Sequence, residues 1–140
     1  MKQRRWQAEI EITVPFYDVD SLDVVWHGNS AKYFELARCA LLESIDYDYV
    51  KMGQSGYAWP VVELFVRYPR ALRFNQKISV LAYIHEYECR LKINYIIRDV
   101  ATGVILTRGH TVQVAVNITD GEMLYELPEI FYNKLGIPAP

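Results

Sequence analysis

The chain has 140 residues, of which 51% are hydrophobic, and a formal net charge of -2 from 15 basic and 17 acidic residues. This length allows one well-buried core and is too short for two ordinary domains, so we expect one domain over residues 1–140. The near balance of charge argues against nucleic acid or an anionic membrane surface as a partner. Short, interrupted apolar stretches and an N-terminus without an apolar signal core predict a cytoplasmic protein with no membrane span.

The first predicted element is a half-buried strand over residues 6–17, where apolar residues recur at every second position: Ile10, Ile12, Val14 and Phe16. A helix is predicted over residues 31–46 because apolar residues follow at helical spacing, and Asn29 or Ser30 is expected to cap it. Most of its circumference is apolar, so we expect a sheet to surround it, with Arg38 among the few solvent-facing positions.

From residue 57 onward the composition is typical of strands, rich in Val, Ile, Tyr and Phe. Four strands are predicted, over residues 59–68, 77–87, 90–100 and 104–118. Consecutive strands with short joints must be antiparallel, and a short helix is predicted over residues 128–135. This order predicts an α+β fold with the long helix packed on one face of the sheet. The strands are too continuously hydrophobic for free solvation, so the second sheet face or an edge strand is expected to contact another subunit.

The passage from the first strand to the long helix holds a concentrated group of polar residues and glycine: Asp18, Asp20, Asp23, His27 and Gly28. An exposed turn before a helix start often presents catalytic groups, because the first helix amides point toward it. The carboxylates could instead be turn formers that bind local amides, and the His27 ring could simply pack. We interpret this segment as the candidate site of chemistry.

Residues 16–35 carry a specific motif: Asp18-Val-Asp20, then Val24-Val-Trp-His27-Gly-Asn, then Tyr33-Phe-Glu35. This motif, and the element order of the whole chain, resemble the hotdog-fold acyl-CoA thioesterases of the 4-hydroxybenzoyl-CoA thioesterase type. The resemblance implies a hotdog fold, in which a five-stranded antiparallel sheet wraps a long central helix. It also implies hydrolysis of an acyl-CoA or acyl-carrier-protein thioester by a homodimer or homotetramer. No cofactor is implied, since coenzyme A is part of the substrate.

By this resemblance Asp20 is the catalytic carboxylate, acting as a nucleophile or as a general base. Asp18 is expected to order the turn. The backbone amides of His27 and Gly28 are expected to polarise the thioester carbonyl at the positive end of the helix. The predicted substrate-binding residues are Asp23, Tyr33, Arg73 and Arg90. The arginines enter this set because the phosphates of coenzyme A require cations.

The chain departs from many of these relatives at two positions, with Asp23 in place of a small residue such as Gly and Ser30 in place of an aromatic residue. Two other activities stay open: a non-hydrolytic acyl-thioester binding protein, and a hotdog dehydratase acting on carrier-bound acyl chains. No metal site is predicted, because His85 and His110 lie in strand patterns without Cys or acidic residues at ligand spacing.

Overall fold

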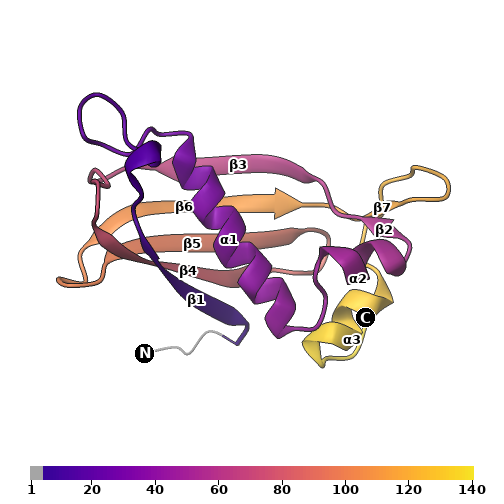
Figure 1. Ribbon diagram of the computed structural model, residues 1–140. Coiled ribbons are helices and arrows are strands. Elements are labelled where there is room, and N and C mark those ends of the chain that lie inside the picture. Colours follow the sequence, from indigo (N-terminus) through magenta and orange to yellow (C-terminus); the bar gives the residue numbers. More distant parts are fainter. Residues whose placement is uncertain (1–4) are drawn as a thin grey trace.

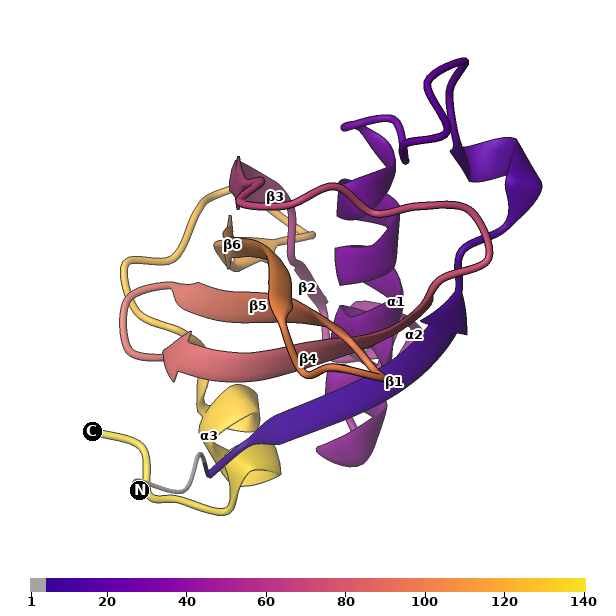
Figure 2. The same ribbon diagram turned by 90° about the vertical axis from the view of Figure 1, so that its left-hand side faces the viewer.

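The computed structural model in Figure 1 describes residues 5–140. Its elements, in chain order, are β1 (Gln7–Thr13), a 3-10 turn (Phe16–Asp18), α1 (Asn29–Ser44), α2 (Tyr49–Gln54), β2 (Tyr57–Ala58), β3 (Val61–Arg67), β4 (Lys77–Glu86), β5 (Leu91–Asp99), β6 (Ile105–Gln113), β7 (Val116–Asn117) and α3 (Glu129–Leu135). Five strands form one antiparallel sheet in the order β1-β4-β5-β6-β3, while β2 and β7 form a separate pair. Helix α1 lies across one face of the large sheet (Figure 1, Figure 2). The predicted α+β layout of a long helix on a five-stranded antiparallel sheet is confirmed.

The core lies between α1 and the large sheet. One apolar face of α1 is almost fully buried there: Tyr33, Phe34, Ala37, Leu41 and Leu42. Phe34 stacks on Tyr95 of β5 with ring centroids 4.3 Å apart. Gly109 of β6 is the cross-strand neighbour of Tyr95, and a Cβ there would overlap the Phe34 ring. The helix can therefore sit close to the sheet, and each large apolar side chain that it buries contributes about 1.5–3 kcal/mol.

Three predicted strands are shorter or interrupted. The first ends at Thr13, since Pro15 precedes a 3-10 turn that carries Asp18 inward. The strand predicted over residues 59–68 corresponds to β3, which begins only at Val61, because Pro60 has no N–H for a ladder. The segment predicted over residues 104–118 divides into β6 and β7, because β7 leaves the large sheet and pairs with β2.

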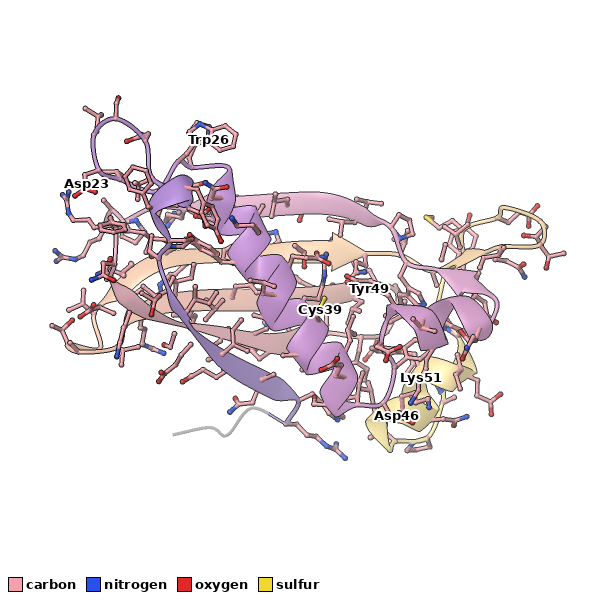
Figure 3. The ribbon with its side chains drawn as sticks, in the orientation of Figure 1. Asp23, Trp26, Cys39, Asp46, Tyr49 and Lys51 are labelled. Atoms are coloured by element: carbon pink, nitrogen blue, oxygen red, sulfur yellow. The ribbon has the colours of Figure 1, made fainter. Side chains whose placement is uncertain are left out.

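The prediction that Arg38 faces solvent is wrong. Its side chain is 7% exposed and forms an ion pair with Glu35, one turn earlier in α1. Tyr49 of α2 lies over it, with the guanidinium carbon 6.0 Å from the ring centroid. Figure 3 shows Tyr49 on the same side of α1 as Cys39. Helical periodicity could not reveal this burial, because it depends on distant segments: Tyr49 of α2 and Tyr95 of β5 both contact the Arg38 side chain.

Tyr95 provides a test of this core at alkaline pH. Burial raises the pKa of its hydroxyl above the usual value of 10.0, and the hydroxyl lies 2.8 Å from that of Thr111. The unfolded chain therefore loses this proton at a lower pH than the folded chain. The stabilising contribution is complete below about pH 10 and is lost as the pH rises from there through the folded-state pKa.

We expect the free energy of unfolding to fall above that pH, and to fall less steeply in Tyr95→Phe, by up to about 1.4 kcal/mol per pH unit. Phenylalanine keeps the stacked ring and removes the ionisable group. Urea unfolding experiments on both proteins, at pH values below and above about pH 10, measure how steeply each free energy of unfolding falls with pH. Equal slopes in the two proteins would contradict the prediction.

Candidate active site

The loop between β1 and α1 is pinned to the connection between β3 and β4. The Asp20 N–H donates to the Val24 carbonyl at 2.8 Å, which closes a small hairpin within the loop. The Val25 N–H donates to the Leu72 carbonyl at 2.8 Å, and Val24 bridges Arg73. These bonds hold Asp20 at a defined place against the β3–β4 connection.

Asp18 is the buried centre of this loop. Its carboxylate accepts a hydrogen bond from the Tyr33 hydroxyl at 2.7 Å and forms an ion pair with Lys32. Its carbonyl accepts a hydrogen bond from the Asn29 side chain at 2.9 Å. Burial and the neighbouring Asp18 carboxylate raise the pKa of Tyr33 above its usual value, so the hydroxyl stays a proton donor. Asp18 thus orders the turn, as predicted, and Tyr33 positions Asp18.

Asp20, in contrast, presents an exposed carboxylate. Its Oδ1 accepts hydrogen bonds from the N–H of Leu22 at 2.8 Å and of Val24 at 3.4 Å. No donor from residues 5–140 contacts Oδ2. The carboxylate is therefore oriented through one oxygen, while the other is open to a reactant.

Asp20 and His27 line the same surface hollow, which has a volume of about 330 Å³. Tyr68 and Arg70 of the β3–β4 connection complete its wall. The Tyr68 hydroxyl donates to the His27 carbonyl at 2.6 Å and ties the helix start to that connection. The sequence did not single out Tyr68, and no local signal marks it, because this contact spans 41 positions of the chain.

The start of α1 borders this hollow through His27 and Ser30. Gly28 is the N-cap of α1, and within residues 5–140 neither the His27 nor the Gly28 N–H donates to a protein acceptor. Helix N-termini favour negative charge, so these amides suit a developing oxyanion. A Cβ on Gly28 would overlap the Trp26 indole, which Figure 3 shows at the start of α1. With the indole in this position, a side chain at residue 28 would require Trp26 or the backbone to move.

The cap of α1 and the backbone of Asp23 both bear on what the sequence predicts for this loop. The predicted cap from Asn29 or Ser30 is wrong, because no side chain caps α1 and Asn29 instead bonds Asp18. Asp23 adopts a φ of 62°, in the left-handed region that favours glycine. Its side chain is exposed and does not line the hollow. Figure 3 labels Asp23 in the loop before α1. Glycine adopts this conformation most easily, and Asp is among the few other residues that tolerate it.

The other predicted substrate contacts do not line this hollow in the protomer. Tyr33 is buried against Asp18, and Arg73 is exposed in the β3–β4 connection. Arg90 lies in the β4–β5 turn, where its Nε is 2.5 Å from a Glu86 carboxylate oxygen. Their roles in substrate binding stay predictions. Among the residues that the structure describes, no three His, Cys, Asp or Glu side chains gather as metal ligands.

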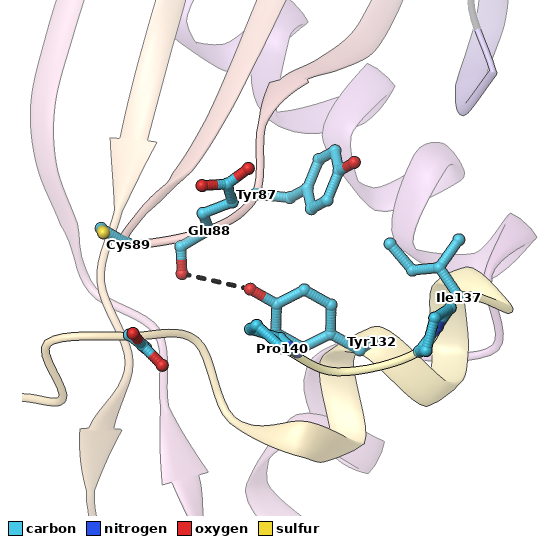
Figure 4. A pocket seen from close by; sticks show the side chains of 8 residues that line it. Tyr87, Glu88, Cys89, Tyr132, Ile137 and Pro140 are labelled. Carbon is cyan, nitrogen blue, oxygen red and sulfur yellow. Dashed lines mark hydrogen bonds between the residues drawn. The ribbon is translucent and has the colours of Figure 1, made fainter.

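A larger cavity of about 440 Å³ lies at the other end of the molecule, between the β4–β5 turn and the segment after α3 (Figure 4). At its edge the Tyr132 hydroxyl donates to the Glu88 carbonyl at 3.5 Å. Glu88 and Glu126 line this cavity, but among the described residues none from the start of a helix does, so the cavity lacks the amide donors that a developing oxyanion needs. The smaller hollow at Asp20 is therefore the candidate active site.

Comparisons with known proteins agree with this geometry. Residues 14–135 match the model of the Thioesterase-like superfamily. A Synechocystis protein provisionally named an esterase is 31% identical over 128 residues, which cover 91% of this chain and 77% of that protein. A Bacillus subtilis protein provisionally named an acyl-CoA thioesterase is 29% identical over 77 residues, or 55% of this chain and 56% of the relative. The structure of a DHNA-CoA thioesterase from Staphylococcus aureus aligns with a TM-score of 0.77 and 25% identity, over 85% of this chain and 80% of that one.

The fold and the site together define an enzyme of the thioester-hydrolase class with a hotdog fold. The chain belongs to the Thioesterase-like superfamily. The family, the hotdog fold and the enzyme class expected from the motif around Asp20 are thereby confirmed. Within residues 5–140, no helix has the length and apolar character needed to cross a membrane.

Proposed function

We propose that the chain hydrolyses an acyl-CoA thioester to a free acid and coenzyme A, with Asp20 as the reactive carboxylate. An acyl-carrier-protein thioester is the second form that the substrate could take. The observation that carries the proposal is the shared hollow of about 330 Å³, where Asp20 and His27 meet at the free N-terminus of α1. An attacking group and an oxyanion donor suffice for this reaction, because a thiolate leaves without strong acid assistance.

Asp20 can promote this hydrolysis by either of two routes. As a nucleophile, Asp20 forms a C–O bond to the carbonyl carbon, the C–S bond breaks to release the thiolate, and water then hydrolyses the mixed anhydride. As a general base, Asp20 takes a proton from water, the water oxygen adds to the carbonyl carbon, and the tetrahedral intermediate expels the thiolate. In both routes the carbonyl oxygen gains negative charge beside the amides of His27 and Gly28, a stabilisation of about 3 kcal/mol in comparable sites.

A thiol-release screen over short-chain, long-chain and aromatic acyl-CoAs tests the proposal. Aromatic substrates belong in the panel because the structural relative from Staphylococcus aureus is named for DHNA-CoA. The purified protein is expected to release thiol from at least one of them. Hydration of an enoyl thioester without thiol release would favour the dehydratase, and tight coenzyme A binding without turnover would favour the binding protein. One domain, a cytoplasmic location and the absence of another cofactor stay predictions.

We also propose that the chain forms a homodimer through β3, one of the two edge strands of the large sheet. Large apolar side chains of β3 are exposed: Val62 is 59%, Leu64 48% and Phe65 45% accessible. An exposed apolar edge strand is a template for pairing with another chain, and a twofold dimer covers the same edge on both copies. A tetramer stays a prediction.

Leu64→Lys is expected to convert the dimer to a monomer, because a charged side chain would enter the apolar centre of that contact. Size-exclusion chromatography with light scattering measures the mass. Val100→Lys is the matched control, since Val100 is 41% exposed but lies just after β5, away from β3. A wild-type monomer, or a Leu64→Lys dimer, would show that β3 is not the interface.

A further inference from the structure

The outer face of the large sheet carries a hollow of about 280 Å³. Helix α1 lies on the other side of the sheet, as Figure 2 shows. The charged and aromatic side chains around the hollow come from four strands: Phe65, Arg67, Tyr83, Lys92, Arg108 and His110. No carboxylate of the described residues is part of its lining. The hollow is therefore strongly positive in a chain whose net charge is slightly negative.

Two arginines stand opposite each other in this hollow. Arg67 of β3 and Arg108 of β6 are cross-strand partners in the sheet register. Like charges at such positions repel each other and destabilise a sheet. Within residues 5–140 neither guanidinium forms an ion pair. Arg67 lies 5.8 Å from the Phe65 ring centroid, a contact that leaves its charge in place.

The nearest carboxylates already have partners. A Glu63 carboxylate oxygen lies 2.7 Å from Nε2 of His110. Glu86 is the register partner of Lys92, but its carboxylate is 2.5 Å from Nε of Arg90. Within residues 5–140 of one protomer, the opposed arginine pair therefore has no counter-charge.

We propose that this hollow binds a small phosphate-bearing molecule. The guanidinium fork holds phosphate oxygens in pairs, and two opposed arginines suit one phosphate or the two groups of a diphosphate. A bound dianion would replace the repulsion between Arg67 and Arg108 by attraction to a shared ligand. The hollow shares no lining residue with the Asp20 hollow, so it is a second site. The phosphate has two candidate sources, the nucleotide end of coenzyme A and a separate phosphorylated compound.

Isothermal titration calorimetry with pyrophosphate and with adenosine 3′,5′-bisphosphate, at constant ionic strength, tests the site. Wild-type protein is expected to bind at least one probe, and Arg67→Gln and Arg108→Gln are each expected to weaken it at least about tenfold. Arg98→Gln is the matched control, because Arg98 is another cation of β5 that does not line the hollow. No binding by wild type, or equal weakening by all three substitutions, would overturn the proposal.

Melting temperatures and kinetics complete the test. Because the two arginines repel each other, Arg108→Gln is expected to melt at the wild-type temperature or above. A loss of phosphate binding in this variant would then come from the missing guanidinium and not from unfolding. A raised KM for an acyl-CoA, with an unchanged KM for the matching acyl-pantetheine, assigns the site to coenzyme A. Unchanged KM values for both assign it to a separate ligand, and either result supports the site. The binding measurement requires no turnover, so its failure is distinct from failure of the proposed hydrolysis.

Discussion

Replacement of Asp20 by Asn is expected to lower kcat for thioester hydrolysis by about 10²–10⁴-fold while the fold is kept. The amide has the shape of the carboxylate, but it neither attacks a carbonyl carbon nor takes a proton from water. Its oxygen can keep the contacts that Oδ1 makes with the amides of Leu22 and Val24, at 2.8 and 3.4 Å. Thiol release at saturating acyl-CoA measures the loss, and circular dichroism checks the fold.

Asp120→Asn is the matched control for this substitution. Asp120 also accepts a hydrogen bond from the N–H two residues later, at 2.8 Å, in an exposed turn. It does not line the hollow, so its replacement is expected to leave kcat unchanged. Near wild-type activity in Asp20→Asn would remove Asp20 from the mechanism.

Gly28→Ala is expected to lower kcat by about 10²–10³-fold, the effect of losing an oxyanion donor. The added methyl group would overlap the Trp26 indole, so the ring or the start of α1 must move. A shift of the start of α1 would displace the amides of His27 and Gly28 from the oxyanion position. Steady-state kcat and KM, measured with the best acyl-CoA of the screen, report the change.

Two further variants test the cause of that loss. Gly53→Ala is the control, because no atom lies within 4 Å of a Cβ built at Gly53 in α2. Adding Trp26→Ala to Gly28→Ala removes the clashing ring and is expected to restore much of the activity. An unchanged rate in Gly28→Ala would show that the added methyl group does not displace amides that the reaction needs, and would contradict the prediction. A double variant without recovery would exclude the ring overlap as the cause.

The large elements of the fold follow from local patterns. Apolar spacing placed α1 within two residues of both observed ends, Asn29 and Ser44, and strand-like composition located β4, β5 and β6. The errors fall where a distant segment decides the structure. Arg38 is buried because Tyr49 lies over it, and the last predicted strand is broken because β7 pairs with β2. A periodicity describes only neighbours along the chain, so it cannot include such contacts.

The sequence alone predicts the candidate reactive residues but not the wall of the hollow, and the catalytic roles of these residues stay predictions. The motif selected Asp20, His27 and Gly28, and the first two line one hollow. The contact of Tyr68 with His27 comes from a segment 41 positions away, and no spacing rule relates the two. The positive φ of Asp23 is likewise a backbone property that composition does not display.

By itself, the sequence determined the class of protein, and it singled out Asp20, the carboxylate that we propose to be reactive. Periodic burial and a spaced motif are properties of consecutive residues, so they are readable without coordinates. Only the tertiary structure decided which groups face each other, as in the hollow that joins Asp20 to His27 and in the opposed pair of Arg67 and Arg108. The physical reason is that strand register and helix packing join segments far apart in the chain, and these contacts depend on the packing of the whole domain.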